Sequence, residues 1–311
     1  MTDGNYSLVM EFTLQGLTSL PEFQFPLFFL FLGIYLVTVV ANLGLITLIS
    51  LNAHLHTPMY YFLFNLSFID IGYSSVFTPK MLMNFVLEKN IISYTGCLTQ
   101  LYFFCFFVIA ECCILTAMAY DHYVAICKPL LYNVILSPRI YSLFVFGSYV
   151  MGCWGSLAHI LCMARLTFCD ATVINHYLCD ILPVLQLSCT STYVNEVVVF
   201  VLVGMNILVS TSTTFISYAF IISNILHISS TEGRSKAFST CSSHIMTVSL
   251  FFGAASFMYV QPSDAESMDH GKVASVFYTN VGPMLNPLIY SLRNKDVRLA
   301  LRKTLKGNVF S

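Results

Sequence analysis

The chain has 311 residues, of which 57% are hydrophobic and 9% are charged, and its formal net charge is −1. Soluble domains carry roughly 25% charged residues, so this composition excludes an ordinary soluble fold. The small net charge, without a basic stripe, gives no basis for nucleic acid as a partner. Because the apolar residues come in long uncharged runs, we expect one helical bundle in a membrane.

A helix needs about 20 apolar residues to cross roughly 30 Å of hydrocarbon, and seven segments meet this length. They lie at 25–50, 58–85, 96–126, 142–164, 197–226, 237–260 and 273–292. The prediction is an all-α, seven-transmembrane helix bundle. It forms one transmembrane domain, 25–292, between an extracellular N-terminus, 1–24, and a cytoplasmic tail, 293–311.

The basic residues are distributed unequally between the two sides of this predicted bundle. One side has ten, namely Lys128, Arg139, Arg234, Lys236, Arg293, Lys295, Arg298, Arg302, Lys303 and Lys306. The other side has four, namely Lys80, Lys89, Arg165 and Lys272. Positive residues favour the cytoplasm, so we expect a multi-pass plasma-membrane protein with its N-terminus outside. Asn5 begins the triplet Asn-Tyr-Ser and is then a glycosylation site.

The longest connector, 165–196, contains Cys169, Cys179 and Cys189 at ten-residue intervals, and Cys97 lies at the outer start of the third span. On an oxidising outer side we expect disulfides rather than free thiols. Four cysteines allow three pairings, and their spacing does not choose among them.

The segment after the seventh span, 294–306, has Val297, Leu301 and Leu305 at four-residue spacing with basic residues between them. This pattern predicts a short amphipathic helix that lies along the inner leaflet and contacts membrane lipid.

Two acids interrupt the apolar spans, Asp70 in the second and Glu111 in the third. An ionisable group in hydrocarbon costs at least a few kcal/mol, so each one suggests a function. The pair could share a proton, or bind sodium together with Asn42 and Asn286. The alternative is a protonated pair that only fixes packing. No other metal and no cofactor is expected.

Pro287 follows Asn286 in the seventh span, and Pro283 precedes it by one turn. A proline frees a backbone carbonyl and bends a helix, and neighbouring polar groups satisfy that carbonyl inside a bundle. We therefore expect a hinge near the inner end of this span.

At the inner end of the third span, residues 118–132 read MAYDHYVAICKPLLY, which resembles the signature of olfactory receptors, a branch of the rhodopsin-like G-protein-coupled receptors. Further matching strings are HTPMY at 56–60, Ser217-Tyr218, KAFSTCSSH at 236–244 and PMLNPLIY at 283–290. The three spaced loop cysteines look like those of the tetrapod-type (class II) receptors. Together these motifs cover almost the whole chain.

The resemblance implies a receptor for a small volatile odorant that activates a stimulatory heterotrimeric G protein and raises cyclic AMP. It also implies the pairings Cys97–Cys179 and Cys169–Cys189. The residues that it implies for the switch and the G-protein surface are Asp121, His122, Tyr123, Tyr218, Lys236, Asn286, Pro287 and Tyr290.

His122 departs from the family pattern, which has Asp-Arg-Tyr where this chain has Asp121-His122-Tyr123. Arg is permanently charged and presents a planar fork of five donors, whereas His is shorter and mostly neutral at pH 7. Coupling to the G protein is therefore in question, and a weakly coupling or decoy receptor is the alternative.

The outer halves of the spans present apolar faces at helical spacing, and similar positions line odorant pockets in the family. The predicted ligand-binding residues are Phe104, Cys105, Val108, Ile109, Leu202, Val203, Asn206, Phe252, Ala255, Ser256, Tyr259, Val276 and Thr279. Tyr259 is the strongest polar candidate. Such a set favours an apolar ligand with one hydrogen-bonding group.

Other classes of membrane protein remain as alternatives. An ion channel or transporter is the better of these, because Asp70 and Glu111 could mark an ion path. An intramembrane enzyme would need a nucleophile with a base, or a metal cluster, whereas His159 and His244 stand alone on apolar spans. We therefore expect a receptor and not an enzyme.

Overall fold

The computed structural model describes residues 11–18, 20–87, 90–169, 172–227, 230–260 and 265–307. Within these ranges, the side chains of 236, 239–240, 258–260, 265–270, 292–293 and 305–307 are not described. The predicted glycosylation site at Asn5 lies outside the described residues.

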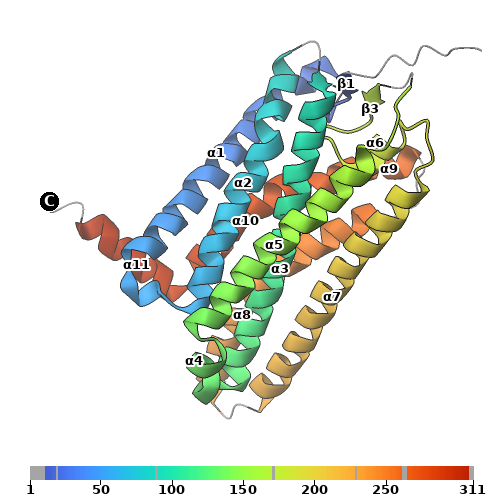
Figure 1. Cartoon of the computed structure of the whole chain (residues 1–311). Helices are drawn as coiled ribbons and strands as arrows, with labels where there is room; N and C mark the ends of the chain where they lie inside the picture. The colour runs from blue at the N-terminus through green and yellow to red at the C-terminus, as the bar shows by residue number, and fades with distance from the viewer. Residues whose placement is uncertain are drawn as a thin grey trace, which may run out of the picture.

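Within the described part of the chain, long helices occupy all seven predicted spans and pack as a bundle (Figure 1). Six of them are α1 (Pro21–Leu51), α2 (Pro58–Val86), α3 (Tyr94–Cys127), α5 (Pro138–Met163), α7 (Tyr193–Leu226) and α8 (Thr231–Val260). The seventh consists of α9 (Ala265–Val276), a π-helical turn η3 (Phe277–Val281) and α10 (Gly282–Arg293). The predicted fold class is confirmed.

The composition of the helices explains which faces they bury. By length and apolar composition alone, α1, α3, α5 and α7 can each cross a membrane. The other helices of the bundle carry polar residues that turn inward, among them Asp70 in α2, His244 in α8 and Asn286 in α10, each at most 2% exposed. Polar groups at membrane depth are tolerated where they are buried in protein.

Prolines begin several helices, where a missing backbone N–H is not needed. Pro21, Pro58 and Pro138 occupy the first turns of α1, α2 and α5. The short elements between the long helices are η1 (Ala53–Leu55), η2 (Pro129–Leu131), α4 (Tyr132–Ile135) and α6 (Ile181–Leu185).

The short helix predicted after the seventh span is present as α11 (Lys295–Gly307). Val297 packs against the bundle at 1% exposure, whereas Leu301 is 45% exposed. The Tyr60 hydroxyl of α2 donates to Asn294 Oδ1 at 3.0 Å, so the junction between α10 and α11 is tied to the bundle.

A small sheet at one end of the bundle was not predicted from the sequence. Its strands are β1 (Glu11–Leu14), β2 (Ile91–Ser93) and β3 (Val173–Ile174), in the order β2-β1-β3. β1 pairs antiparallel with β2, with Phe12 opposite Ile92, and parallel with β3, with Leu14 opposite Ile174. We call this end of the bundle the sheet end, and the opposite end, which carries α4, the α4 end (Figure 1).

Candidate ligand cavity and switch

A small enclosed cavity lies between α3, α7 and α8, toward the sheet end. Its volume is about 60 Å³. The described residues that line it are Phe104, Cys105, Val108, Ile109, Cys112, His159, Ile181, Leu202, Val203, Asn206, Ile207, Phe251, Phe252 and Ala255. No Asp, Glu, Lys or Arg is among these lining residues.

Most of the ligand-contact positions predicted from helical spacing surround this one cavity. Nine of them line it: Phe104, Cys105, Val108, Ile109, Leu202, Val203, Asn206, Phe252 and Ala255. Ser256, Val276 and Thr279 lie outside the described lining, and Thr279 contacts Tyr177 instead. The side chain of Tyr259 lies outside the described part of the structure.

Five lining residues were not predicted, and for three of them the sequence held a usable signal. Cys112, Ile207 and Phe251 are each four residues from a predicted contact on the same helix, so helical spacing could have added them. His159 stands alone on α5, and Ile181 comes from the loop that precedes α7. No helical periodicity points to these two residues.

Two polar side chains line the otherwise apolar cavity. The Oδ1 atom of Asn206 is buried and has no hydrogen-bond partner among the described residues. His159 is 3% exposed and lies on the neighbouring helix α5. An unpaired buried acceptor costs free energy until a donor reaches it, so the cavity suits a molecule with an apolar body and a hydroxyl group.

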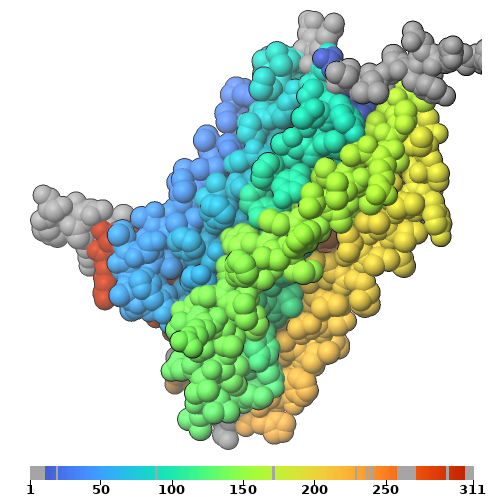
Figure 2. Space-filling view, in the orientation of Figure 1, coloured from blue at the N-terminus to red at the C-terminus, as the bar shows by residue number. Residues whose placement is uncertain are grey.

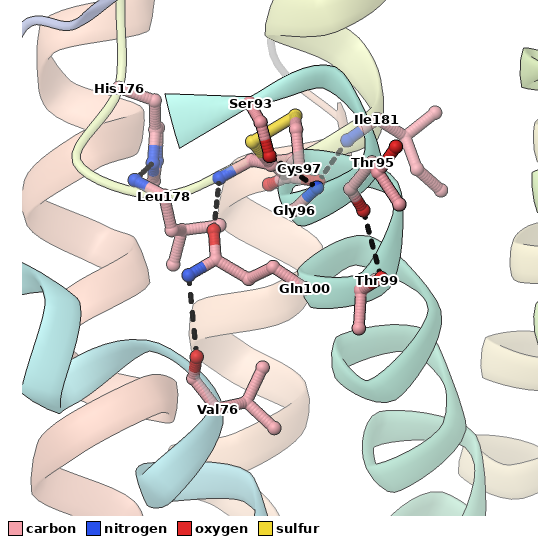
Figure 3. Close-up of a disulfide and its surroundings, with 12 residues drawn as sticks. Val76, Ser93, Thr95, Gly96, Cys97, Thr99, Gln100, His176, Leu178 and Ile181 are labelled. Carbon is pink, nitrogen blue, oxygen red and sulfur yellow. Dashed lines mark hydrogen bonds between the residues drawn. A yellow bond between two sulfur atoms is a disulfide. The ribbon is translucent and has the colours of Figure 1, made fainter. Parts of the chain in front are cut away.

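The loop between α5 and α7 closes the cavity at the sheet end. Ile181 of this loop lines the cavity and is 2% exposed, and Cys179 beside it is fully buried. The expected disulfides Cys97–Cys179 and Cys169–Cys189 are both present. The first joins this loop to the start of α3 (Figure 3).

Gln100 of α3 supports the same loop through two hydrogen bonds. Its Oε1 accepts from the backbone N–H of Cys179 at 2.9 Å, and its Nε2 donates to the Val76 carbonyl of α2 at 3.3 Å (Figure 3). Close to the disulfide, Gln100 therefore connects the loop to both α3 and α2. No pattern in the sequence predicts this role of Gln100.

Two aromatic residues of the loop reach the seventh helix. The Tyr177 hydroxyl lies 2.9 Å from both the Ser275 and Thr279 hydroxyls, and Tyr177 is 1% exposed. His176 stacks on Tyr177 with ring centroids 4.6 Å apart, and its Nδ1 accepts from the Leu178 N–H. Burial, together with the nearby charge of Lys272, lowers the pKa of His176 to about 3. The His176 ring is therefore neutral at physiological pH.

The two buried acids and Asn286 form one polar cluster between α2, α3 and α10. Asn286 Nδ2 donates to both carboxylate oxygens of Asp70, at 3.2 and 3.1 Å. Glu111 is 1% exposed, and its Oε2 has no hydrogen-bond partner among the described residues. The cluster therefore has acceptor capacity for a proton or a cation, whereas no group of three or more His, Cys, Asp or Glu side chains is placed to hold a metal within the described part of the chain.

Asn42 of α1 satisfies the backbone carbonyl that the proline of the seventh helix leaves without a donor. Pro287 has no N–H, so it cannot donate to the carbonyl four residues earlier, which belongs to Pro283. Asn42 Nδ2 of α1 donates to this freed carbonyl at 3.0 Å, and also to the Thr38 carbonyl at 2.9 Å. The π-helical turn η3 ends immediately before this segment. The regular α-helical hydrogen bonding of the seventh helix is therefore interrupted at η3 and at Pro287, as expected for a hinge.

At the α4 end, a histidine joins three helices. His244 Nε2 of α8 lies 3.0 Å from the Leu115 carbonyl of α3, so this nitrogen carries the proton and donates it. His244 Nδ1 then accepts from the Tyr218 hydroxyl of α7 at 2.6 Å. Both ring nitrogens are satisfied, and the contacts hold α3, α7 and α8 together.

His122 packs against this histidine and not against an acid. It is 3% exposed, its ring centroid lies 5.3 Å from that of His244, and its Nε2 has no hydrogen-bond partner among the described residues. The preceding Asp121 accepts from the Tyr132 hydroxyl of α4 at 2.7 Å. Burial and the Asp121 carboxylate raise the pKa of Tyr132, so this phenol stays a donor.

The remaining predicted switch residues lie near the same end. The Tyr123 ring has Lys128 Nζ at 5.6 Å on one side and the Phe220 ring at 5.9 Å. Tyr290 of α10 is 7% exposed. Lys236 belongs to α8, and its side chain lies outside the described part of the structure.

Comparison with known proteins gives consistent matches over nearly the full length. A family model described as olfactory receptor matches residues 31–307. Olfactory receptor 8B3 of Homo sapiens is 70% identical over 310 residues, which cover 98% of this chain and 99% of that protein. Its counterpart in Mus musculus is 70% identical over 305 residues, covering 98% of this chain and 96% of that protein.

Another relative extends over both whole chains. Olfactory receptor 8B8 of Homo sapiens is 66% identical over 311 residues and covers 100% of each. The crystal structure of squid rhodopsin superimposes with a TM-score of 0.72 at 18% identity, covering 94% of this chain and 88% of that chain, which shows the fold alone. The chain therefore belongs to the olfactory receptor family, whose members are odorant-sensing G-protein-coupled receptors of the plasma membrane and not enzymes.

Proposed function

We propose that this chain is an odorant-activated receptor whose cavity between α3, α7 and α8 binds a small apolar molecule with one hydrogen-bond donor. The observation that carries the proposal is that Asn206 lines the cavity and has a buried Oδ1 atom without a partner among the described residues. Ligand pockets are typically apolar with a few placed polar groups.

The size and charge of the cavity restrict the ligand. Pockets for drug-sized molecules are roughly 300–1,000 Å³, whereas this cavity is about 60 Å³. The ligand is therefore small, and side chains move to admit it. Because no charged side chain is among the described lining residues, a neutral volatile molecule is favoured over an ion.

We assign the sheet end to the extracellular side and the α4 end to the cytoplasm. Both disulfides lie at the sheet end, and disulfides persist in oxidising compartments. Of the predicted cytoplasmic basic residues, Lys128 and Arg139 flank α4. This orientation places the N-terminus and Asn5 outside, the C-terminus inside, and α11 along the inner leaflet in contact with lipid.

The α4 end then faces a stimulatory G protein, and activation raises cyclic AMP. The contacts of Tyr218, His244 and Leu115 connect α7, α8 and α3 there, so their rearrangement would open or close the surface that the G protein meets. Asp121, Tyr123, Lys236 and Tyr290 belong to the same switch in this proposal. Asn286 and Pro287 form its hinge, with Asn42 on the freed Pro283 carbonyl.

His122 supports a second candidate, a receptor that couples weakly or acts as a decoy. The side chain packs against His244 and makes no hydrogen bond through Nε2 to any described residue. An arginine at this position would present a charge and five donors to the G protein. The two candidates differ in the size of the signal and not in ligand binding.

The cluster of Asp70, Glu111 and Asn286 binds sodium or shares a proton in this proposal. Its carboxylate oxygens are hard ligands of the kind that such cations prefer. Ligand potency measured at increasing sodium concentrations tests the ion site. Potency independent of sodium, with both acids intact, would remove the ion site and leave a protonated pair that shares a proton or only fixes packing.

The function is tested in cells that express the chain with a cyclic AMP reporter. A chemically diverse panel of odorants should evoke cyclic AMP without ionic current. Ligand-evoked current without cyclic AMP would favour a channel. Ligand binding without a cyclic AMP response would favour the weakly coupling receptor if His122→Arg restores that response. No binding of any odorant at confirmed surface expression would refute the proposal.

The cavity is tested with pairs of ligands that differ in one donor, such as an alkanol and its methyl ether. Asn206→Leu removes the acceptor and should lower the potency of the alcohol by roughly 2- to 13-fold, from about 0.5–1.5 kcal/mol for one hydrogen bond, with less effect on the ether. Thr211→Val on the same helix is the control, because the Thr211 hydroxyl donates to the Ile207 and Leu208 carbonyls and lies outside the described lining. Tyr259→Phe tests the other polar contact that we propose from the sequence. Equal losses for both ligands in Asn206→Leu would argue against the assignment.

A further inference from the structure

The outer wall of the bundle contains a second and larger hollow, on the surface formed by α3, α5 and α7. This groove has a volume of about 740 Å³. Figure 2 shows the surface hollowed between α5 and α7. The described residues that line it are Cys113, Thr116, Ala117, Tyr120, Leu143, Phe144, Gly147, Ser148, Met151, Val201, Leu202, Met205, Asn206, Val209, Ser210 and Thr213.

The groove opens toward the hydrocarbon of the membrane. Leu143 and Met151 of α5 and Met205 of α7 line it, and each is more than half exposed. Met151 and Met205 lie well inside their helices, and Leu143 lies just inside the start of the predicted fourth span, so all three face the membrane. The groove is therefore filled from the bilayer and not from water.

Leu202 and Asn206 of α7 line both the groove and the inner cavity. They are one helical turn apart, and Leu202 is 37% exposed. On α3 the two hollows are lined by adjacent residues, Cys112 on the cavity side and Cys113 on the groove side. The partition between the hollows is therefore one side chain thick, and it includes the unpaired acceptor Asn206 Oδ1.

The direct path from the sheet end is closed much more firmly. A ligand arriving there meets Ile181 and the loop held by the Cys97–Cys179 disulfide. It would also have to displace the hydrogen bonds of Gln100 and of Tyr177. Rotation of Leu202 and Asn206 about their side-chain bonds breaks no backbone hydrogen bond and takes place on a fast timescale.

We propose that the ligand reaches the inner cavity sideways from the membrane, through the groove between α3, α5 and α7, with Leu202 and Asn206 as the gate. This inference rests on the proposed function, since it takes the inner cavity as the ligand site. Each methylene group favours the hydrocarbon over water by roughly fourfold. The same apolar character that suits the cavity thus concentrates the ligand at the mouth of the groove.

A path differs from a binding site in its effect on rates. Narrowing a path slows arrival and departure by the same factor, so it leaves occupancy at equilibrium unchanged. Narrowing a separate binding site in the groove would lower its occupancy instead. Rates and final levels must therefore be measured together.

Gly147 and Gly204 offer a matched pair of substitutions. A Cβ atom added at either glycine meets no heavy atom within 4 Å. Gly147 lines the groove, whereas Gly204 is an exposed residue of α7 outside both linings. Gly147→Trp therefore adds a large ring on the wall of the groove from a Cβ position that is open, and Gly204→Trp adds the same ring elsewhere on the membrane-facing surface. Thr213→Phe narrows the groove from α7 and serves as a second test variant.

The experiment uses the full chain in phosphatidylcholine nanodiscs and the diazirine probe 3-azioctanol. The probe is mixed in for increasing times before a flash of light, and labelled peptides are quantified by mass spectrometry. Label on α5 at residues 143–151 reports arrival in the groove. Label on Phe251, Phe252 or Ala255 of α8 reports arrival in the cavity, because these residues line only the cavity and are at most 8% exposed.

In the wild-type chain, label on α5 should precede label on α8. Gly147→Trp and Thr213→Phe should lengthen the half-time for α8 at least fivefold with the same final level, whereas Gly204→Trp should behave as wild type. A half-time for α8 within twofold of wild type in both groove variants would overturn the lateral path. A lower final level at an unchanged half-time would also overturn it, in favour of a separate binding site. If α8 is never labelled in the wild-type chain, the cavity does not accept the probe and the proposed ligand site itself fails.

Discussion

Replacing Gln100 by leucine tests whether the loop over the cavity is held as the structure shows. The two side chains are similar in size, so the substitution leaves little empty space. It removes the acceptor of the Cys179 N–H, which is bonded at 2.9 Å and belongs to a fully buried residue. An orphaned buried donor costs about 1–3 kcal/mol. The Val76 carbonyl loses a longer bond of 3.3 Å and adds little to this cost.

The expected result is a lower apparent melting temperature of the purified receptor, followed by circular dichroism. One kcal/mol shifts the midpoint of a domain of this order of size by roughly 2–4 °C, so Gln100→Leu should melt about 2–12 °C below wild type. Thr99→Val on the same turn is the control. Its exposed hydroxyl donates only to the Thr95 carbonyl, so the midpoint should change by less than about 1 °C. A midpoint for Gln100→Leu that matches this control would refute the reasoning.

Three further predictions concern the switch and the loop. His122→Arg should raise ligand-stimulated cyclic AMP, because it restores a charged donor fork; an unchanged or smaller maximal response at equal surface expression would count against this. Tyr218→Phe leaves His244 Nδ1 without its donor at 2.6 Å and should cost about 1–3 kcal/mol, so a melting temperature equal to wild type would contradict the bond. Burial lowers the pKa of His176 to about 3, below its unfolded value near 6.5, so its stabilising contribution is complete above pH 6.5 and is lost as pH falls toward 3. At pH 5 this contribution of His176 to the free energy of unfolding is lower by about 2 kcal/mol. If the melting temperature of His176→Phe falls with acid as steeply as that of wild type, His176 is not the source of the pH dependence.

The seven spans could be predicted from the sequence because hydrocarbon leaves the backbone no partner but itself. A long uncharged run must then be helical, and its length alone identifies it. The sheet at the end of the bundle has no such constraint. β1 shows an alternation, with Phe12 and Leu14 buried between the exposed Glu11 and Thr13, but four residues are too few to distinguish a strand from a loop. Its pairing with β2 and β3 depends on where the loops meet in space.

The faces of the cavity could be predicted as far as helical periodicity extends. Side chains three and four residues apart share a face, which is enough to place Phe104 and Val108 on one wall. Residues of the loop have no such period, so Ile181 and Tyr177 could not be placed. Because the position of Tyr177 could not be predicted, helical spacing predicts Thr279 as a ligand contact. In the structure the Thr279 hydroxyl contacts the Tyr177 hydroxyl. A polar residue on an inward face predicts that its side chain forms a hydrogen bond. Which group forms that bond depends on how the helices and loops pack.

Asn42 illustrates the same limit within the helices. Its place in an apolar span suggests a polar cluster, and the two acids were the nearest candidates in the sequence. In the structure its amide donates to the Pro283 carbonyl, which Pro287 cannot reach as a donor. The sequence contained both halves of this arrangement, a proline without an N–H and a buried amide. Their association depends on the packing of α1 against α10, which no local pattern encodes.

His122 can be recognised in the sequence as a departure from the family motif. Its surroundings in the structure indicate how this departure affects coupling. The ring meets that of His244 edge-on, and the two nitrogens of His244 are already satisfied by Leu115 and Tyr218, so the contact adds packing without a new hydrogen bond. Asp121 meanwhile accepts from Tyr132. An arginine at position 122 would bring a permanent charge into this buried setting, where it gains most by leaving it for an acidic or carbonyl partner. Histidine carries no permanent charge, so it has a weaker electrostatic drive to leave its packing against His244. We therefore expect arginine at position 122 to favour rearrangement of the contacts at the α4 end, and so to increase coupling without changing what the cavity binds.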